Sequence, residues 1–88
     1  MKINDLFKFL LFTVQALVDS PNDIQIRVEE TDEKVMFIVA PRQEEVGQLI
    51  GERGCIANAI RVLLRSLSTK WKLKKVYLYI TEPKDFKE

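Results

Sequence analysis

The chain has 88 residues, a length that supports one compact domain with a hydrophobic core of modest size. Hydrophobic residues make up 47% of it and charged residues 31%, which excludes a disordered tail, a collagen-like repeat and a disulfide scaffold. The sequence has no histidine, and its one cysteine, Cys55, cannot form an internal disulfide or a cysteine-rich zinc site. We therefore expect a cytoplasmic protein without catalytic residues, a metal or another cofactor, or a small-molecule substrate.

Charge is unevenly distributed along the chain, although the net charge is only +1. Residues 42–75 contain eight basic and three acidic side chains, whereas the first 41 residues carry a net charge of −3. Such asymmetry can create a positive face on a nearly neutral protein, which would suit nucleic acid as a partner. A solvated helix face and strand end would give the same pattern, so charge alone leaves both interpretations open.

The first predicted element is a helix that starts with Asn4 or Asp5 as its cap and runs to about Asp19, before Ser20-Pro21 stops it. Its apolar stretch is shorter than the roughly 20 residues needed to cross a membrane, so we expect no membrane association. The face predicted to lie in the core comprises Leu6, Phe7, Leu10, Val14 and Leu17. A second apolar set on nearly the opposite side indicates either a partner surface or a more deeply buried helix. Its members are Phe9, Phe12 and Ala16.

Three later segments, at about 24–29, 34–40 and 75–81, alternate in the way expected of strands. The apolar residues that share one face of each segment are Ile24, Ile26 and Val28, then Val35, Phe37 and Val39, then Val76, Leu78 and Ile80. The second segment is apolar on both faces, which predicts a central position in the sheet. Tyr77 and Tyr79 lie on the other side of the third strand. Together with Trp71 they could stack on bases, but aromatic residues in strands and loops more often pack locally, so the three are not assigned to the site.

Two more helices are predicted between the second and third strands, a short one at 42–50 after Pro41 and a longer one at about 55–69. The core face of the longer helix is predicted to comprise Ile56, Ile60, Leu63, Leu64 and Leu67. Its opposite, solvated face comprises Asn58, Arg61 and Arg65. The acids expected to face solvent are Glu44, Glu45 and Glu52.

A glycine-framed turn, Gly51-Glu52-Arg53-Gly54, separates these two helices. Glycines leave the backbone free to approach a phosphate closely, and the helix that follows presents its amide groups and positive dipole end there. Two glycines three residues apart are weak evidence by themselves, because turns between helices often use glycine. The order helix, strand, strand, helix, GERG, helix, strand makes the signal more specific.

This order and the IGERG turn resemble the type II KH domain with its GxxG loop. The segments VAP, VGQLIGERG and AIRVLL further resemble the KhpA-type family of small bacterial RNA-binding proteins. The resemblance implies an α+β fold of order α-β-β-α-α-β, with helices packed on one face of a three-stranded sheet. A single KH domain at 1–82 and a short charged tail at 83–88 are expected. For function it implies single-stranded RNA binding, pairing as a homodimer or with a larger KH-domain protein, and RNA chaperone or regulatory activity linked to cell shape and cell-wall biogenesis.

Carried onto this chain, the RNA-binding residues implied by the resemblance lie in the loop and beside it on the two helices. They are Ile50, Gly51, Glu52, Arg53, Gly54, Ala57, Asn58, Arg61 and Arg65, with Val46 and Ile60 also in the groove. Each has a structural interpretation as well: the apolar residues as core, Ala57 as a point of close helix packing, and the two arginines on the longer helix as a solvated face. A candidate partner interface comprises Phe9, Phe12 and Val62.

The chain departs from the family pattern at three positions. Glu52 puts an acid between the glycines, and Cys55 and Asn58 stand where relatives often have basic residues. Each missing cation weakens binding to phosphate, so we expect low affinity from one domain, raised by dimerisation through avidity. The same departures motivate an alternative function, a KH-fold protein–protein interaction module with little RNA affinity. Cys55 is expected to be a small apolar filler rather than a reactive thiol.

Overall fold

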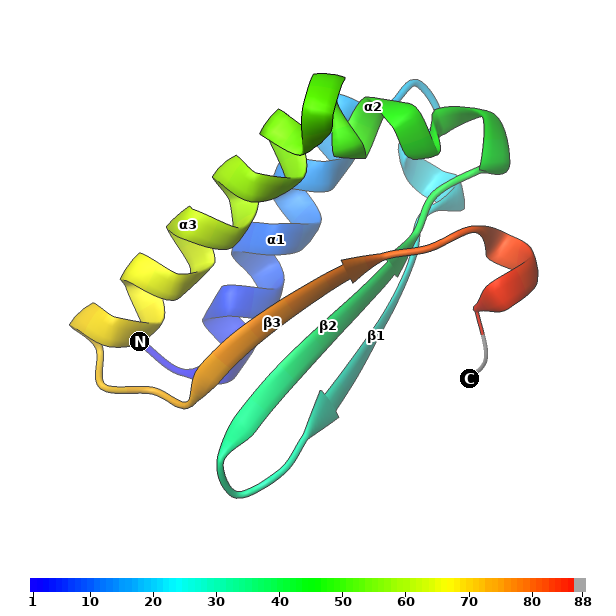
Figure 1. Cartoon of the computed structure of the whole chain (residues 1–88). Helices are drawn as coiled ribbons and strands as arrows, with labels where there is room; N and C mark the ends of the chain where they lie inside the picture. Colours follow the sequence, from blue (N-terminus) through cyan, green and yellow to red (C-terminus); the bar gives the residue numbers. More distant parts are fainter. Residues whose placement is uncertain (87–88) are drawn as a thin grey trace.

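The protein consists of helices packed on one face of a three-stranded sheet (Figure 1). A computed structural model describes residues 1–86. The elements are α1 (Ile3–Leu17), β1 (Gln25–Glu30), β2 (Lys34–Ala40), α2 (Val46–Ile50), α3 (Cys55–Lys70) and β3 (Lys75–Ile80). Short 3-10 turns lie at Pro21–Asp23, Gln43–Glu45, Glu52–Gly54 and Pro83–Asp85. The order α-β-β-α-α-β confirms the predicted α+β fold class.

The strand β2 lies between the other two, in the order β1-β2-β3. It pairs antiparallel with β1 and parallel with β3. A parallel partner needs a crossover connection, which α2 and α3 supply on the helical face. Val35, Phe37 and Val39 of β2 are fully buried, so the central position predicted from its two apolar faces is confirmed.

The core lies between the sheet and the helices α1 and α3. Its buried side chains are Leu6, Leu10, Val14, Val18, Val35, Phe37, Val39, Leu49, Ile60, Leu64 and Leu78. The prediction that Leu17 and Leu63 lie in the core is wrong, because the buried stripe of each helix is narrower than expected. Leu17 is 38% exposed at the end of α1, and Val18 in the extended segment that follows takes the buried place. Leu63 is 50% exposed, since it lies about 100° around α3 from the buried Leu64.

The helix α1 begins and ends earlier than predicted. Lys2 is its N-cap, and Asp5 lies in the first turn, where its carboxylate accepts a hydrogen bond from the backbone N–H of Lys2 at 2.8 Å. Asp5 therefore stabilises the helix start from inside the helix rather than as its cap. The helix ends at Leu17, short of the predicted Asp19. Within residues 1–86, no helix is long and apolar enough to cross a membrane.

The outer side of α1 carries two phenylalanines in different environments. Phe12 is 76% exposed, whereas Phe9 is half-buried and packs against the core. Deeper burial of the helix therefore accounts for Phe9 but leaves Phe12 as a large apolar side chain in solvent.

Two contacts join segments that lie far apart in the sequence. Glu45 is only 5% exposed, and its carboxylate accepts a hydrogen bond from the backbone N–H of Ser20 at 2.9 Å. The expectation that Glu45 faces solvent is therefore wrong, because this buried acceptor connects the end of α1 to the start of α2.

The Arg27 guanidinium lies 5.7 Å from the centre of the Phe86 ring, which brings part of the predicted tail against β1. Residues 87 and 88, the end of that tail, lie outside the described residues.

Candidate nucleic-acid interface

The GERG turn links α2 to α3 through left-handed backbone. The angle φ is +76° at Gly51, +56° at Arg53 and +77° at Gly54. Glycine adopts such angles freely, whereas a residue with a side chain loses about 1–2 kcal/mol there. The Gly51 N–H donates to the Gly47 carbonyl at 2.8 Å, and the Gly54 N–H donates to the Gly51 carbonyl at 3.1 Å. Both glycine N–H groups are therefore hydrogen-bonded within the turn, so a bound phosphate would meet other groups of the loop.

The two glycines of the turn have different reasons to lack a side chain. A Cβ atom added at Gly51 would lie 2.7 Å from Cγ1 and 2.9 Å from the backbone N of Ile56, closer than packed atoms tolerate. A Cβ atom at Gly54 would meet only the Asn58 amide nitrogen, at 3.8 Å. Gly51 therefore lets α3 pack against the turn, while Gly54 leaves open space in front of the backbone.

Burial divides the other predicted site residues. Glu52 and Arg53 are exposed, Ile50 is 37% exposed beside the loop, and Asn58 is exposed on the first turn of α3. The remaining side chains are less accessible: Val46 is half-buried, and Ala57 and Ile60 are each 3% exposed. For Ala57 and Ile60, burial favours the interpretation as packing residues rather than RNA contacts.

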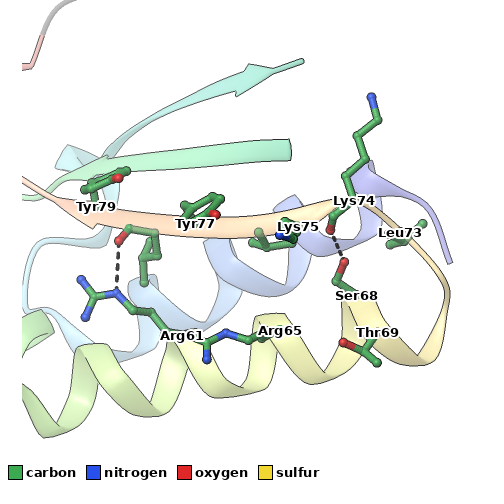
Figure 2. A pocket seen from close by; sticks show the side chains of 11 residues that line it. Arg61, Arg65, Ser68, Thr69, Leu73, Lys74, Lys75, Tyr77 and Tyr79 are labelled. Atoms are coloured by element: carbon green, nitrogen blue, oxygen red, sulfur yellow. Dashed lines mark hydrogen bonds between the residues drawn. The ribbon is translucent and has the colours of Figure 1, made fainter. Parts of the chain in front are cut away.

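The two arginines of α3 differ in how firmly they are held. Arg61 donates from Nε to the Leu78 carbonyl of β3 at 3.2 Å and from Nη1 to the Asn58 side-chain oxygen at 3.1 Å. Arg65 is exposed one turn further along the helix. Figure 2 shows both side chains between α3 and β3, with Arg61 reaching across to the strand. Arg61 is thereby fixed, and Arg65 is the freer of the two to reach a phosphate.

A groove of about 670 Å³ runs between α3 and β3 (Figure 2). It is lined by Arg61, Arg65, Ser68, Thr69, Leu73, Lys74, Lys75, Val76, Tyr77, Leu78 and Tyr79. At its far end the Ser68 hydroxyl donates to the Lys74 carbonyl, which holds the end of α3 to the start of β3. Of the predicted site residues, only Arg61 and Arg65 line this groove. The predicted groove residues Val46, Ile50, Ala57 and Ile60 do not line it, nor do Asn58 and the four residues of the GERG loop, and the two tyrosines were not predicted. The signal that could have found them is the alternation of β3, which puts Lys75, Tyr77 and Tyr79 on one exposed face.

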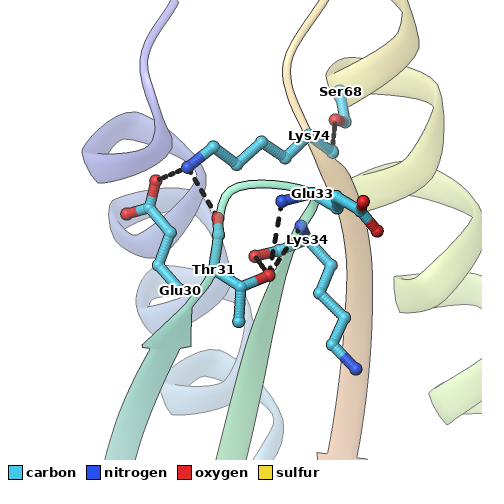
Figure 3. Close-up of polar contacts among 6 residues, drawn as sticks. All are labelled: Glu30, Thr31, Glu33, Lys34, Ser68 and Lys74. Atoms are coloured by element: carbon cyan, nitrogen blue, oxygen red, sulfur yellow. Dashed lines mark hydrogen bonds and ion pairs between the residues drawn. The ribbon is translucent and has the colours of Figure 1, made fainter.

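Most of the basic side chains at 42–75, of which Arg61, Arg65, Lys74 and Lys75 line this groove, make no ion pair within residues 1–86. Of the eight basic residues at 42–75, Arg42 pairs with Asp23 and Glu44, and Lys74 pairs with Glu30 at 2.6 Å. The Lys74 ammonium also donates to the Thr31 carbonyl at 2.7 Å, so its side chain holds the β1–β2 turn rather than the groove (Figure 3). Within residues 1–86, the other six basic side chains of this segment make no ion pair. They are Arg53, Arg61, Arg65, Lys70, Lys72 and Lys75.

A three-stranded sheet in this order, one helical face and a glycine-framed turn between two helices together define a type II KH domain. A sequence model described as the KH domain of KhpA/KhpB matches residues 8–80. The chain therefore belongs to the KhpA/KhpB KH-domain family, which confirms the resemblance seen in the sequence.

Curated relatives agree with this assignment over most of the chain. The RNA-binding protein KhpA of Listeria monocytogenes is 39% identical over 75 residues, which cover 85% of this chain and 97% of the relative. The protein of the same name from Streptococcus pneumoniae is 32% identical over 73 residues, covering 83% and 90%. Among solved structures, an Era variant from Aquifex aeolicus bound to GDP·AlF4⁻ superposes with a TM-score of 0.58 at 12% identity. That match covers 83% of this chain and 29% of the Era chain, and it shows the fold alone.

Proposed function

We propose that the protein binds single-stranded RNA, with the GERG loop holding the backbone and the groove between α3 and β3 receiving bases. The observation that carries this proposal is the groove itself, on a domain of the KhpA/KhpB family. Its lining includes Arg61, Arg65 and Lys75, which make no ion pair within residues 1–86. The relatives named RNA-binding proteins support the same conclusion. KH loops clamp about four nucleotides of a single strand, and the bases then turn into an adjoining groove.

The charges at the loop set the expected strength of binding. Arg53 supplies one cation, and the open space before Gly54 leaves room for a phosphate. Glu52 offsets the charge of Arg53, and Asn58 adds none. The affinity of one domain is therefore low and falls with salt, because neutralised phosphates release counterions on binding.

Pairing of two domains would raise this affinity through avidity. The exposed apolar side chains Phe12, Val62 and Leu63 lie on the helical layer and are 76%, 56% and 50% exposed. They support a homodimer, or a pair with a larger KH-domain protein, formed through the helices. Weak contacts repeated over two domains also suit the proposed role as an RNA chaperone or post-transcriptional regulator in a bacterial cytoplasm.

A second candidate function is a protein–protein interaction module with little RNA affinity. The acid at Glu52 and the exposed Phe12 are the observations that favour it. It differs from the first in predicting self-association without salt-sensitive RNA binding.

The test is fluorescence anisotropy of a labelled single-stranded RNA at two salt concentrations. The wild type should bind in a salt-sensitive way, and Glu52→Asp/Arg53→Asp should lose that binding while remaining folded by circular dichroism. Lys8→Asp, at an exposed position of α1, makes the same change in net charge away from the loop and should bind like the wild type. Unchanged affinity of the double variant would refute the loop as the site. No binding by the wild type would favour the interaction module.

A further inference from the structure

The open face of the sheet carries aromatic and basic side chains that the GERG loop does not use. We propose that this face is a second contact surface for the same RNA strand, with Tyr77 and Tyr79 stacking on bases and Lys34 and Lys75 meeting phosphates. The inference rests on the proposed RNA binding and extends it beyond the groove. It predicts that longer RNA binds more tightly than the few nucleotides that the loop can hold.

The strand register fixes which side chains share this face. In the pairing of β2 with β3, Lys34 lies beside Lys75, Met36 beside Tyr77 and Ile38 beside Tyr79. Their neighbours along the two strands point into the core, and the helices cover only that side (Figure 1). Tyr77 is 42% exposed and Tyr79 is 51% exposed. The two rings therefore stand in a row, about 6.6 Å apart along the strand, on a face that α1, α2 and α3 leave open. Phe86 covers this face only beside Arg27 of β1.

The two lysines select an anionic partner. Lys34 and Lys75 are neighbours on strands about 4.8 Å apart, where like charges repel each other. Within residues 1–86 neither has an ion pair. Glu29 of β1, which shares the open face, pairs with Arg27. The Lys34 ammonium lies 5.8 Å from the centre of the Tyr77 ring. A phosphate between the lysines would relieve their repulsion, with an aromatic ring beside it for the attached base.

The face is continuous with the groove that receives bases in the proposed function. Tyr77, Tyr79 and Lys75 line that groove together with Arg61 and Arg65 (Figure 2). The strand β3 is the edge of the sheet, so an RNA strand leaving the groove passes over this edge onto the open face. Exposed aromatic side chains on a sheet are a known platform for unstacked bases, and such stacking tolerates any sequence.

The experiment compares a short RNA of about four nucleotides with one of about twelve, since only the longer strand can span the loop and the sheet. Tyr77→Ala/Tyr79→Ala should lose more affinity for the long RNA than for the short one, which meets the two rings only where they line the groove. The extra loss on the long RNA should be at least about fivefold per ring, the lower end for base stacking. Tyr77→Phe/Tyr79→Phe, which keeps the rings, should restore long-RNA binding. Trp71→Ala removes an exposed aromatic ring outside the groove lining and serves as the control.

A second variant, Lys34→Gln/Lys75→Gln, keeps both tyrosines and therefore tests the same face even if the tyrosine variants misfold. It removes a repulsion, so its Tm should be equal to or above that of the wild type, while the salt slope for long RNA falls by about 0.7 per lysine. Equal affinity of wild type and alanine variant for the long RNA would overturn the inference, as would equal losses on both RNAs. Failure of the wild type to bind either RNA would instead refute the proposed function and the inference with it. Loss of self-association alone in the tyrosine variants would assign the face to a protein partner and overturn the inference.

Discussion

Replacing each glycine of the GERG turn by alanine separates its packing role from its binding role. At Gly51, φ is +76° and ψ is 173°, a region that residues with side chains essentially never occupy, at a strain of about 1–3 kcal/mol. The added Cβ would also lie 2.7 Å from Cγ1 of Ile56, and overpacking of this kind costs about 1–3 kcal/mol. The expected destabilisation by Gly51→Ala is therefore about 2–6 kcal/mol.

Gly54→Ala should be milder, because only the backbone angle opposes it. Gly54 has φ +77° and ψ 14°, for which a side chain costs about 1–2 kcal/mol, and the new methyl group has open space. A domain of 88 residues is stable by about 4–13 kcal/mol, so this variant should stay folded. Its methyl group would nevertheless stand in the open space that the proposed function assigns to a phosphate, so Gly54→Ala should lose RNA affinity at a smaller cost in stability than Gly51→Ala.

Thermal unfolding followed by circular dichroism distinguishes the two substitutions. Each kcal/mol shifts Tm by about 4–8 °C in a domain of this size, so Gly51→Ala should lower Tm by at least about 8 °C. RNA anisotropy is then measured below the lower Tm. Equal Tm values for the two variants would refute the contact with Ile56 as the reason for Gly51. Wild-type RNA affinity of Gly54→Ala would refute the approach of phosphate at that position.

Three further substitutions probe other parts of the protein. Phe12→Ser removes a side chain that is 76% exposed, so its Tm should lie within a few degrees of the wild type. Sedimentation should show loss of self-association, and an unchanged mass would exclude Phe12 from the interface. Glu45→Ala leaves the Ser20 N–H without its acceptor and should destabilise the fold by about 1–3 kcal/mol in urea unfolding, whereas no change would mean that this contact contributes nothing. Arg61→Lys keeps the charge but loses the paired hydrogen bonds to the Leu78 carbonyl and the Asn58 side chain, so it should weaken RNA binding without changing the salt slope. Arg65→Lys should bind RNA like the wild type.

The elements with a strong local pattern could be predicted from the sequence, and their ends and contacts could not. The strand β2 was predicted with its observed bounds, Lys34–Ala40, because it is apolar on both faces and Pro41 follows it. The start of α1 depends on which backbone N–H the Asp5 carboxylate reaches, and a sequence pattern does not specify this. Leu63 shows the same limit, since periodicity gives the direction of a helix face but not how wide a stripe its neighbours cover.

The candidate site divides in the same way. The GERG loop could be predicted because it is local, and its glycines follow from the backbone angles of a tight turn. The close approach of Ile56 to Gly51 and the groove between α3 and β3 depend on how helices and sheet pack, so the sequence alone did not reveal them. The sequence does not assign Tyr77 and Tyr79 to the site, because aromatic residues in strands usually pack locally, whereas exposures of 42% and 51% leave both rings accessible.

In this groove, the sheet edge and the side chain of Asn58 fix the position of a cation, the Arg61 guanidinium. The strand β3 lies at the edge of the sheet, so its outward carbonyls have no strand partner, and the Arg61 guanidinium binds one of them, at Leu78. The same side chain is held from the other side by Asn58, whose side-chain oxygen accepts a hydrogen bond from Arg61 Nη1. Asn58 therefore contributes by orienting a neighbouring cation instead of adding one. If RNA binds in this groove as proposed, a wall fixed in this way beforehand loses less conformational entropy on binding, which would partly offset the weak charge of the loop.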